Sequence, residues 1–137
     1  MTAEPTSGTA APPVAYSVLI GLTSLVVLLQ GLWAGIFLEH DGRRDKATTA
    51  LDLHSAGASL AVLLALVAVV VATMRLRARR DLLWGTVALF VLLLVEMAVG
   101  QLIRDSDQDT LTAVHVPLAM VLMGLCVWLP LRARAAR

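Results

Sequence analysis

The stretch from Leu51 to Thr73, LDLHSAGASLAVLLALVAVVVAT, is apolar almost throughout, and Asp52 is its one charged side chain. A helix of this length crosses the hydrocarbon core of a bilayer, since each residue rises about 1.5 Å and a span takes roughly 20 residues. Three further stretches of this kind occur at Val14–Leu38, Leu82–Ile103 and Thr110–Leu131. The sequence therefore predicts four transmembrane helices.

The composition and the short connections define the fold class. The chain has 137 residues, of which 58% are hydrophobic and 15% are charged, whereas a soluble domain is roughly half apolar and about a quarter charged. The loops between the apolar stretches are short, so neighbouring helices are expected to be antiparallel. We expect an all-α, polytopic membrane protein with an up-down four-helix bundle over residues 14–131. A disordered tail rich in Pro, Thr and Ala is expected over residues 1–13 and a basic tail over residues 132–137.

The basic residues are distributed unevenly between the two ends of the predicted bundle. The side with both termini carries seven, and the other side carries four, Arg43, Arg44, Lys46 and Arg104. Positive charge favours the cytoplasmic side, which places both termini in the cytoplasm and the protein in the plasma membrane. Arginine clusters beside membrane spans are typical topology signals and lipid-headgroup anchors, so no nucleic-acid partner is expected. An aromatic belt is expected from Tyr16, Trp84 and Trp128 at the inner interface and Trp33 near the outer one.

Four polar side chains inside the predicted spans occur at one depth. They are Gln30, His54, Glu96 and His115, one from each helix, all in the outer half of the bundle. Polar groups inside a membrane are costly and usually face the bundle interior. A polar layer facing the interior is therefore expected there.

Small residues line the helical face below His54. At 100° per residue this face contains Ala58, Ala61, Ala65, Ala68 and Ala72, with Gly57 near its edge. Such a stripe lets a neighbouring helix or a flat ligand approach the backbone closely. On the fourth helix the same periodicity aligns His115 with Ala119, Leu122, Cys126 and Leu129.

His54 and His115 suggest a metal cofactor. Two neutral histidines that project from facing helices at one depth can hold haem iron axially. Each could instead be a hydrogen-bonded interior residue. A zinc site with Glu96 is less favoured, because no HxxxH or HExxH spacing is present. His40 follows Glu39 in a loop and is expected to be solvated.

These residues also resemble motifs of one half of the haem A synthase family. Members of that family resemble two fused four-helix bundles, each with a histidine early in its second and fourth helices. The segment VGQLIRDSDQDTLTAVHVPLAMVLM is similar to the family's passage from third to fourth helix, with its histidine pattern at Val114–Ala119. QGLWAG at Gln30–Gly35 is similar to a first-helix segment, and DLHSAGA places His54 at the second-helix histidine.

Two departures narrow what the resemblance implies. Leu51 stands where the catalytic half of the family has a glutamate, and no pair of outer-loop cysteines is present, since Cys126 is the single cysteine. The chain is thus more similar to the half that only binds haem b than to the half that hydroxylates haem. It also resembles small actinobacterial four-helix membrane proteins of unassigned function.

The first functional hypothesis is a membrane protein with one b-type haem per chain near the outer leaflet. His54 and His115 are the expected axial ligands, Arg104 is the expected partner of the propionates, and Gln30 and Glu96 complete the polar layer. The haem would serve electron transfer, or haem storage or delivery. Besides the bilayer, the expected partners are a second copy or a larger respiratory or haem-pathway complex.

The rival hypothesis is a cofactor-free membrane protein, either an accessory subunit or a small transporter. Its basis is Glu96, because a carboxylate inside the membrane is a frequent element of proton relays and cation sites. The sequence shows no nucleophile–base arrangement and no phosphate-binding loop, so no catalytic residue is assigned.

Overall fold

The computed structural model describes residues 11–40, 48–106 and 109–135. They form α1 (Val14–Glu39), α2 (Thr48–Arg75), α3 (Arg80–Ser106), the short 3-10 helix η1 (Asp109–Leu111) and α4 (Thr112–Arg134), with no strand among them. The four α-helices are long and apolar enough to cross a membrane. The predicted all-α, four-span architecture is confirmed, and each helix extends past its predicted span at one or both ends.

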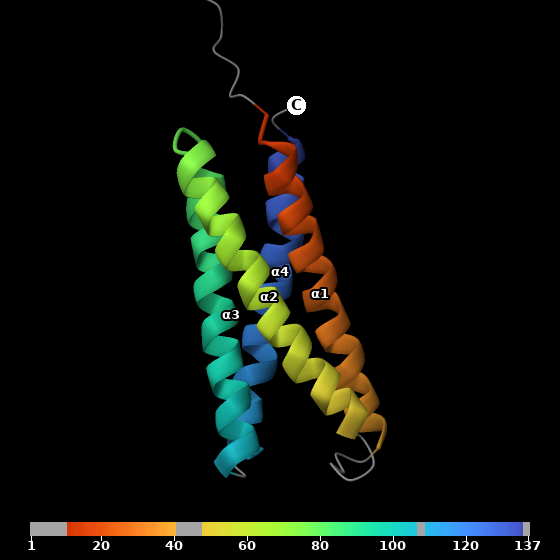
Figure 1. Ribbon diagram of the computed structural model, residues 1–137. Coiled ribbons are helices and arrows are strands. Elements are labelled where there is room, and N and C mark those ends of the chain that lie inside the picture. The colour runs from red at the N-terminus through yellow and green to blue at the C-terminus, as the bar shows by residue number, and fades with distance from the viewer. Residues whose placement is uncertain (1–10, 41–47, 107–108, 136–137) are drawn as a thin grey trace, which may run out of the picture.

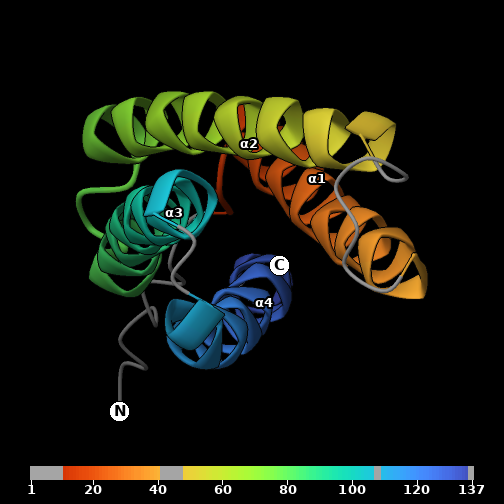
Figure 2. The same cartoon turned by 90° about the horizontal axis from the view of Figure 1, so that it is seen from below.

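The helices form an antiparallel ring. Figure 1 shows α1 beginning and α4 ending at the same end of the bundle, which we call the terminal end, with the α2–α3 connection there as well. We call the opposite end the loop end. In the ring, α1 packs on α2 and α4, and α3 packs on α2 and α4, whereas α2 and α4 are diagonal and not neighbours (Figure 2). This is the predicted up-down topology.

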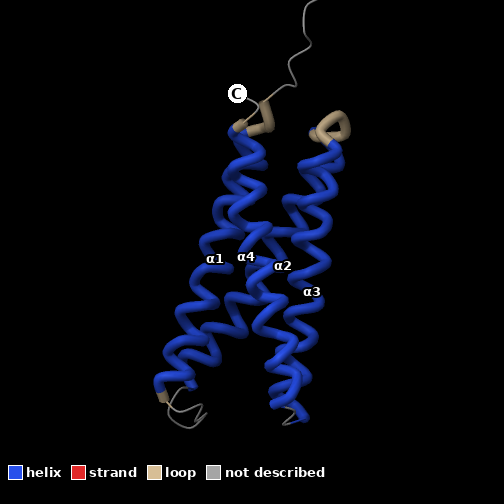
Figure 3. The backbone as a smooth tube through the Cα atoms, turned by 180° about the vertical axis from the view of Figure 1, so that it is seen from behind, coloured by secondary structure: helices blue, strands red, loops and turns tan. Residues whose placement is uncertain are grey.

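The bundle changes its pairing along its length. Toward the terminal end, α1 lies beside α4 and α2 beside α3, whereas toward the loop end α1 lies beside α2 and α3 beside α4 (Figures 1 and 3). The two pairs diverge toward the loop end. The residues of the predicted polar layer lie in this half.

The fully buried core occupies the terminal half of the bundle. On α2 it consists of Ala61, Ala65, Ala68 and Ala72, each with no exposed surface. On α4 it includes Leu122, Cys126 and Leu129, as the alignment with His115 predicts. The core ends near the middle of each helix, at Val27, Ala61, Leu93 and Leu122. Among the described residues beyond that level toward the loop end, only Ala50 and Glu96 have buried side chains. The small-residue face of α2 is therefore an interior face, packed tightly over half its length.

Tyr16 belongs to this core, so its predicted place in an aromatic belt is wrong. The side chain is fully buried, and its hydroxyl lies 2.8 Å from Thr86 Oγ1 on α3. Thr86 also donates to the Leu82 carbonyl, 2.7 Å away, so the two hydroxyls satisfy each other inside apolar packing. Trp84 and Trp128 are exposed on the outer surface of the bundle, as a belt requires.

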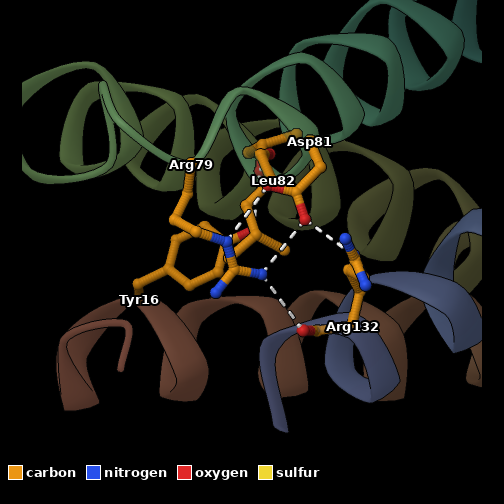
Figure 4. A network of polar contacts seen from close by, with 6 residues as sticks. Tyr16, Arg79, Asp81, Leu82 and Arg132 are labelled. Carbon is orange, nitrogen blue, oxygen red and sulfur yellow. Dashed lines mark hydrogen bonds and ion pairs between the residues drawn. The ribbon is translucent and has the colours of Figure 1, made fainter. Parts of the chain in front are cut away.

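Arg79 and Asp81 join the two helix pairs at the terminal end. Arg79 donates through Nε and Nη2 to the two carboxylate oxygens of Asp81, both at 3.1 Å, and through Nη2 to the Arg132 carbonyl of α4 at 3.3 Å (Figure 4). Arg132 Nε donates to Asp81 Oδ2 at 2.7 Å. The bonds to Asp81 raise the pKa of Arg79 above its ordinary value, so the guanidinium stays charged although only 8% of the side chain is exposed. Arg79 is thus an interior structural residue, not the headgroup anchor that the sequence suggests.

The expected tails lie largely outside the described part of the chain. Residues 1–10, most of the predicted disordered tail, are outside it, as are residues 41–47, which contain Arg43, Arg44 and Lys46. Residues 136–137 are also outside it. Helix α4 continues to Arg134, so the first half of the expected basic tail is helical.

Single cysteines at opposite ends test the span and its orientation. In intact cells, a membrane-impermeant maleimide is expected to label a Glu39→Cys variant directly and an Arg77→Cys variant only after permeabilisation. Both positions are exposed, at the loop end and the terminal end respectively. The native Cys126 is 2% exposed and serves as the unlabelled control. The reverse pattern would contradict cytoplasmic termini, and labelling of both variants in intact cells would contradict membrane spanning.

Candidate functional site

The polar residues at the loop end form two pairs, one in each of the diverging helix pairs. His54 of α2 contacts Gln30 of α1, and His115 of α4 contacts Glu96 of α3. Arg104, two turns after Glu96 on α3, lies 3.3 Å from Ser55 Oγ, directly after His54, so the two pairs lie beside each other at the loop end. The two histidines therefore belong to one local site although their helices are diagonal in the ring.

The contact of His54 fixes the proton on its ring. Its Nδ1 lies 3.3 Å from the main-chain carbonyl oxygen of Gln30. A carbonyl oxygen only accepts hydrogen bonds, so Nδ1 must carry the proton and donate it. In the neutral ring, Nε2 is then unprotonated and has a lone pair available for an acid or a metal.

Gly57 makes room for the Gln30 side chain, one turn along α2 from His54. A Cβ atom at Gly57 would overlap the side-chain amide of Gln30. Gln30 Nε2 donates to the Val26 carbonyl at 3.3 Å, while the buried Gln30 Oε1 has no hydrogen-bond partner among the described residues. The glycine therefore lets α1 and α2 approach closely beside the histidine.

The contact of His115 is with the most deeply buried carboxylate of the described chain. His115 Nδ1 lies 2.5 Å from Glu96 Oε2, and only 8% of the Glu96 side chain is exposed, against 24% for His115. The approach is close but not aligned as a hydrogen bond, and Glu96 Oε1 has no partner among the described residues. Within the predicted polar layer, Glu96 therefore lies against His115, whereas Gln30 lies against His54.

Gly100, one turn further along α3 than Glu96, lies beside the His115 ring. A Cβ atom at Gly100 would lie 3.6 Å from His115 Cε1, in ordinary van der Waals contact with the ring. Glu96 and Gly100 are four residues apart and share a helix face, so α3 presents both the carboxylate and a flat surface to His115. Gly100 was not predicted as a site residue, although a glycine within an apolar helix often marks a close approach.

Arg104 lies at the rim of the site. Its Nη1 lies 3.3 Å from Ser55 Oγ, directly after His54 on α2, and its Nη2 donates to Gln101 Oε1 at 2.8 Å. Its Nε is 3.9 Å from a carboxylate oxygen of Asp105, and about half of the side chain is exposed. The guanidinium thus links α3 to the turn of α2 that carries His54. Arg104 is in the last turn of α3, where a spanning helix meets the membrane–water interface.

Two other predictions were the solvation of His40 and the less favoured zinc site at Glu96. His40, expected to be solvated, has Nδ1 2.8 Å from the Ile36 carbonyl and so caps the end of α1. In the described part of the chain, no group of three His, Cys, Asp or Glu side chains is placed to hold a metal ion. This gives no support to a zinc site made by Glu96 with the two histidines.

No protein-family model, curated protein or solved structure matches this chain. The resemblance to the haem A synthase family therefore stays a prediction from short sequence motifs.

A double-mutant cycle measures the coupling between Glu96 and His115. We expect Glu96→Gln to stay near the wild-type free energy of unfolding, because the amide keeps the size of the side chain and can place an oxygen beside the ring nitrogen. Glu96→Leu should cost about 1–3 kcal/mol, because a polar nitrogen, His115 Nδ1, then lies against an apolar side chain inside the bundle. In a His115→Leu background the same change should cost much less. Unfolding titrations in mixed micelles provide the four values, and strictly additive costs would show that the two side chains are not coupled.

Proposed function

We propose that this chain is an integral membrane protein that holds one b-type haem between His54 and His115, near the loop end of the bundle. The observation that carries the proposal is the environment of the two Nδ1 atoms. One donates to the Gln30 carbonyl and the other lies against the Glu96 carboxylate. Histidine ligands usually engage a carbonyl or carboxylate through the nitrogen that does not bind the metal. Both Nε2 atoms are then left for iron.

The arrangement of the helices supports the same proposal. The histidines come from diagonal helices that are not neighbours in the ring, so a flat group between them would lie inside the bundle. At this level the helix pairs diverge (Figure 3), and His54, His115 and Gln30 are half-buried. The tightly packed alanine face of α2 begins at Ala61, nearer the terminal end than His54.

Three further residues have roles in this proposal. Arg104 is placed at the rim to bind a haem propionate by charge-assisted hydrogen bonds. Glu96 holds the His115 ring and increases its basicity as a ligand, and Gln30 fixes the proton on His54. A haem with two histidine ligands supplies reversible one-electron transfer, and the polar rim would also suit transient holding of haem for delivery.

The membrane, the orientation of the chain and its partners are proposed as well. We place the protein in the plasma membrane with both termini in the cytoplasm, which puts the haem toward the outer leaflet. A redox or haem-pathway complex is the proposed partner class. A second copy is the other, since Gly31 and Gly35 of α1 have open space around them for a close helix contact.

A second candidate function rests on Glu96 and His115 alone. A carboxylate this deeply buried beside an imidazole can exchange a proton with it, as in intramembrane proton relays. This function needs no haem and suits an accessory subunit or a small transporter. It predicts loss of activity in Glu96→Gln, whereas the haem proposal predicts that Glu96→Gln keeps the cofactor.

The visible spectrum of purified protein tests the haem proposal. Protein expressed with an adequate haem supply is expected to show a sharp Soret band and resolved α and β bands on reduction. His54→Ala and His115→Ala should each remove or convert these bands, because each variant lacks one of the two imidazoles that would hold the haem. Added imidazole should restore the wild-type bands in part.

His40→Ala is the matched control, since it removes a histidine at the loop end that caps α1 and lies outside the polar layer. Its spectrum should equal that of the wild type. A colourless wild type that gains no band on haem titration would contradict the proposal, as would a spectrum that survives both His→Ala changes.

A further inference from the structure

A groove opens between α1 and α4 at the terminal end, at the opposite end of the bundle from the histidines. It has a volume of about 240 Å³ and is lined by Ser17, Ile20, Gly21, Pro130, Ala133 and Arg134. The groove exists because Gly21 has no side chain and nothing within 4 Å of where a Cβ would lie. The small Ala133 and the compact Pro130 on the facing helix leave that space unfilled.

The groove is graded from polar to apolar along the helices. Ser17 and Arg134 lie in the outermost turns of α1 and α4, whereas Ile20, Gly21 and Pro130 lie about one turn deeper. In a membrane-spanning bundle the outer turn is at headgroup level and the deeper turn is at the level of the acyl chains. The order of these residues matches the order of groups in a phospholipid.

The terminal end of the bundle, where the groove lies, is strongly positive. The described part of this end contains one carboxylate, that of Asp81, and six arginines. The arginines are Arg75, Arg77, Arg79, Arg80, Arg132 and Arg134. Asp81 is engaged by Arg79 and Arg132, so it does not neutralise Arg134. The groove therefore favours an anion at its outer edge.

We propose that this groove is a binding site for one anionic phospholipid. The phosphate lies at Arg134 with the hydroxyl of Ser17 beside it, and one acyl chain follows Ile20 and Gly21 toward the membrane interior. The volume supports a partial enclosure, since pockets that surround a whole ligand measure roughly 300–1,000 Å³. The rest of the lipid would remain in the bilayer. This inference does not depend on the haem proposal.

Native mass spectrometry of the full-length protein in detergent tests the site. The protein is titrated with phosphatidylglycerol or with phosphatidylcholine of identical acyl chains. We expect one phosphatidylglycerol to bind more tightly than phosphatidylcholine. Arg134→Gln should weaken that binding about fivefold, the equivalent of about 1 kcal/mol for one basic residue at a membrane surface. Arg75→Gln removes a charge at the same end, away from the groove, and should leave binding unchanged.

A pair of glycine variants separates the groove from general lipid contact. Gly21→Leu places a side chain in the groove, whereas Gly124→Leu makes the same change at another exposed glycine with nothing within 4 Å. Gly21→Leu should weaken phosphatidylglycerol binding at least fivefold, and Gly124→Leu should not. Equal binding of the two lipids, or equal effects of the two glycine variants, would overturn the proposal. A change of oligomeric mass in Gly21→Leu would overturn it in favour of a second copy of the chain in the groove.

Discussion

The close packing of the α2 alanine face against its neighbours is the interaction on which the rest of this bundle depends. In a bilayer, apolar side chains gain little by leaving lipid, so helices associate through tight van der Waals contact between small residues. Ala61, Ala65, Ala68 and Ala72 provide that contact, since none has any exposed surface. They lie at the centre of the tightly packed terminal half. Nearer the loop end the same face carries Gly57 and His54, and the two helix pairs diverge from each other there.

The two ends of the molecule satisfy their polar groups in different ways. At the terminal end, Tyr16 pairs with Thr86, and Arg79 and Arg132 share Asp81, so polar contacts cross between helix pairs and lock them together. At the loop end the contacts of both histidines stay within a helix pair. The 3.3 Å contact of Arg104 with Ser55 crosses between the helix pairs there. A group that joins His54 to His115 would add a contact between the two helix pairs at the loop end.

Much of this architecture follows from local patterns in the sequence, and the remainder depends on how the helices meet. Helix number, antiparallel order and the interior face of α2 were predictable because they depend on hydropathy and on 100° periodicity within one helix. The burial of Tyr16 and Arg79 was not, because it depends on the level at which α4 ends beside the start of α3. The choice of His115 as the partner of Glu96 depends in the same way on the position of α4 along α3. The hydrogen bond of His40 to the Ile36 carbonyl was not predictable, because a cap needs the geometry of the last turn of α1, which composition does not give.

We propose that one iron is held by two imidazoles, His54 and His115, from helices that are not neighbours in the ring. Low-temperature electron paramagnetic resonance of the oxidised, haem-loaded protein tests it most directly, because the ferric signal reports both spin state and axial ligands. The account predicts a low-spin signal typical of two imidazole ligands in the wild type. It predicts conversion to high spin in His54→Ala and in His115→Ala. A high-spin wild type, or a low-spin signal that persists in either variant, would contradict it.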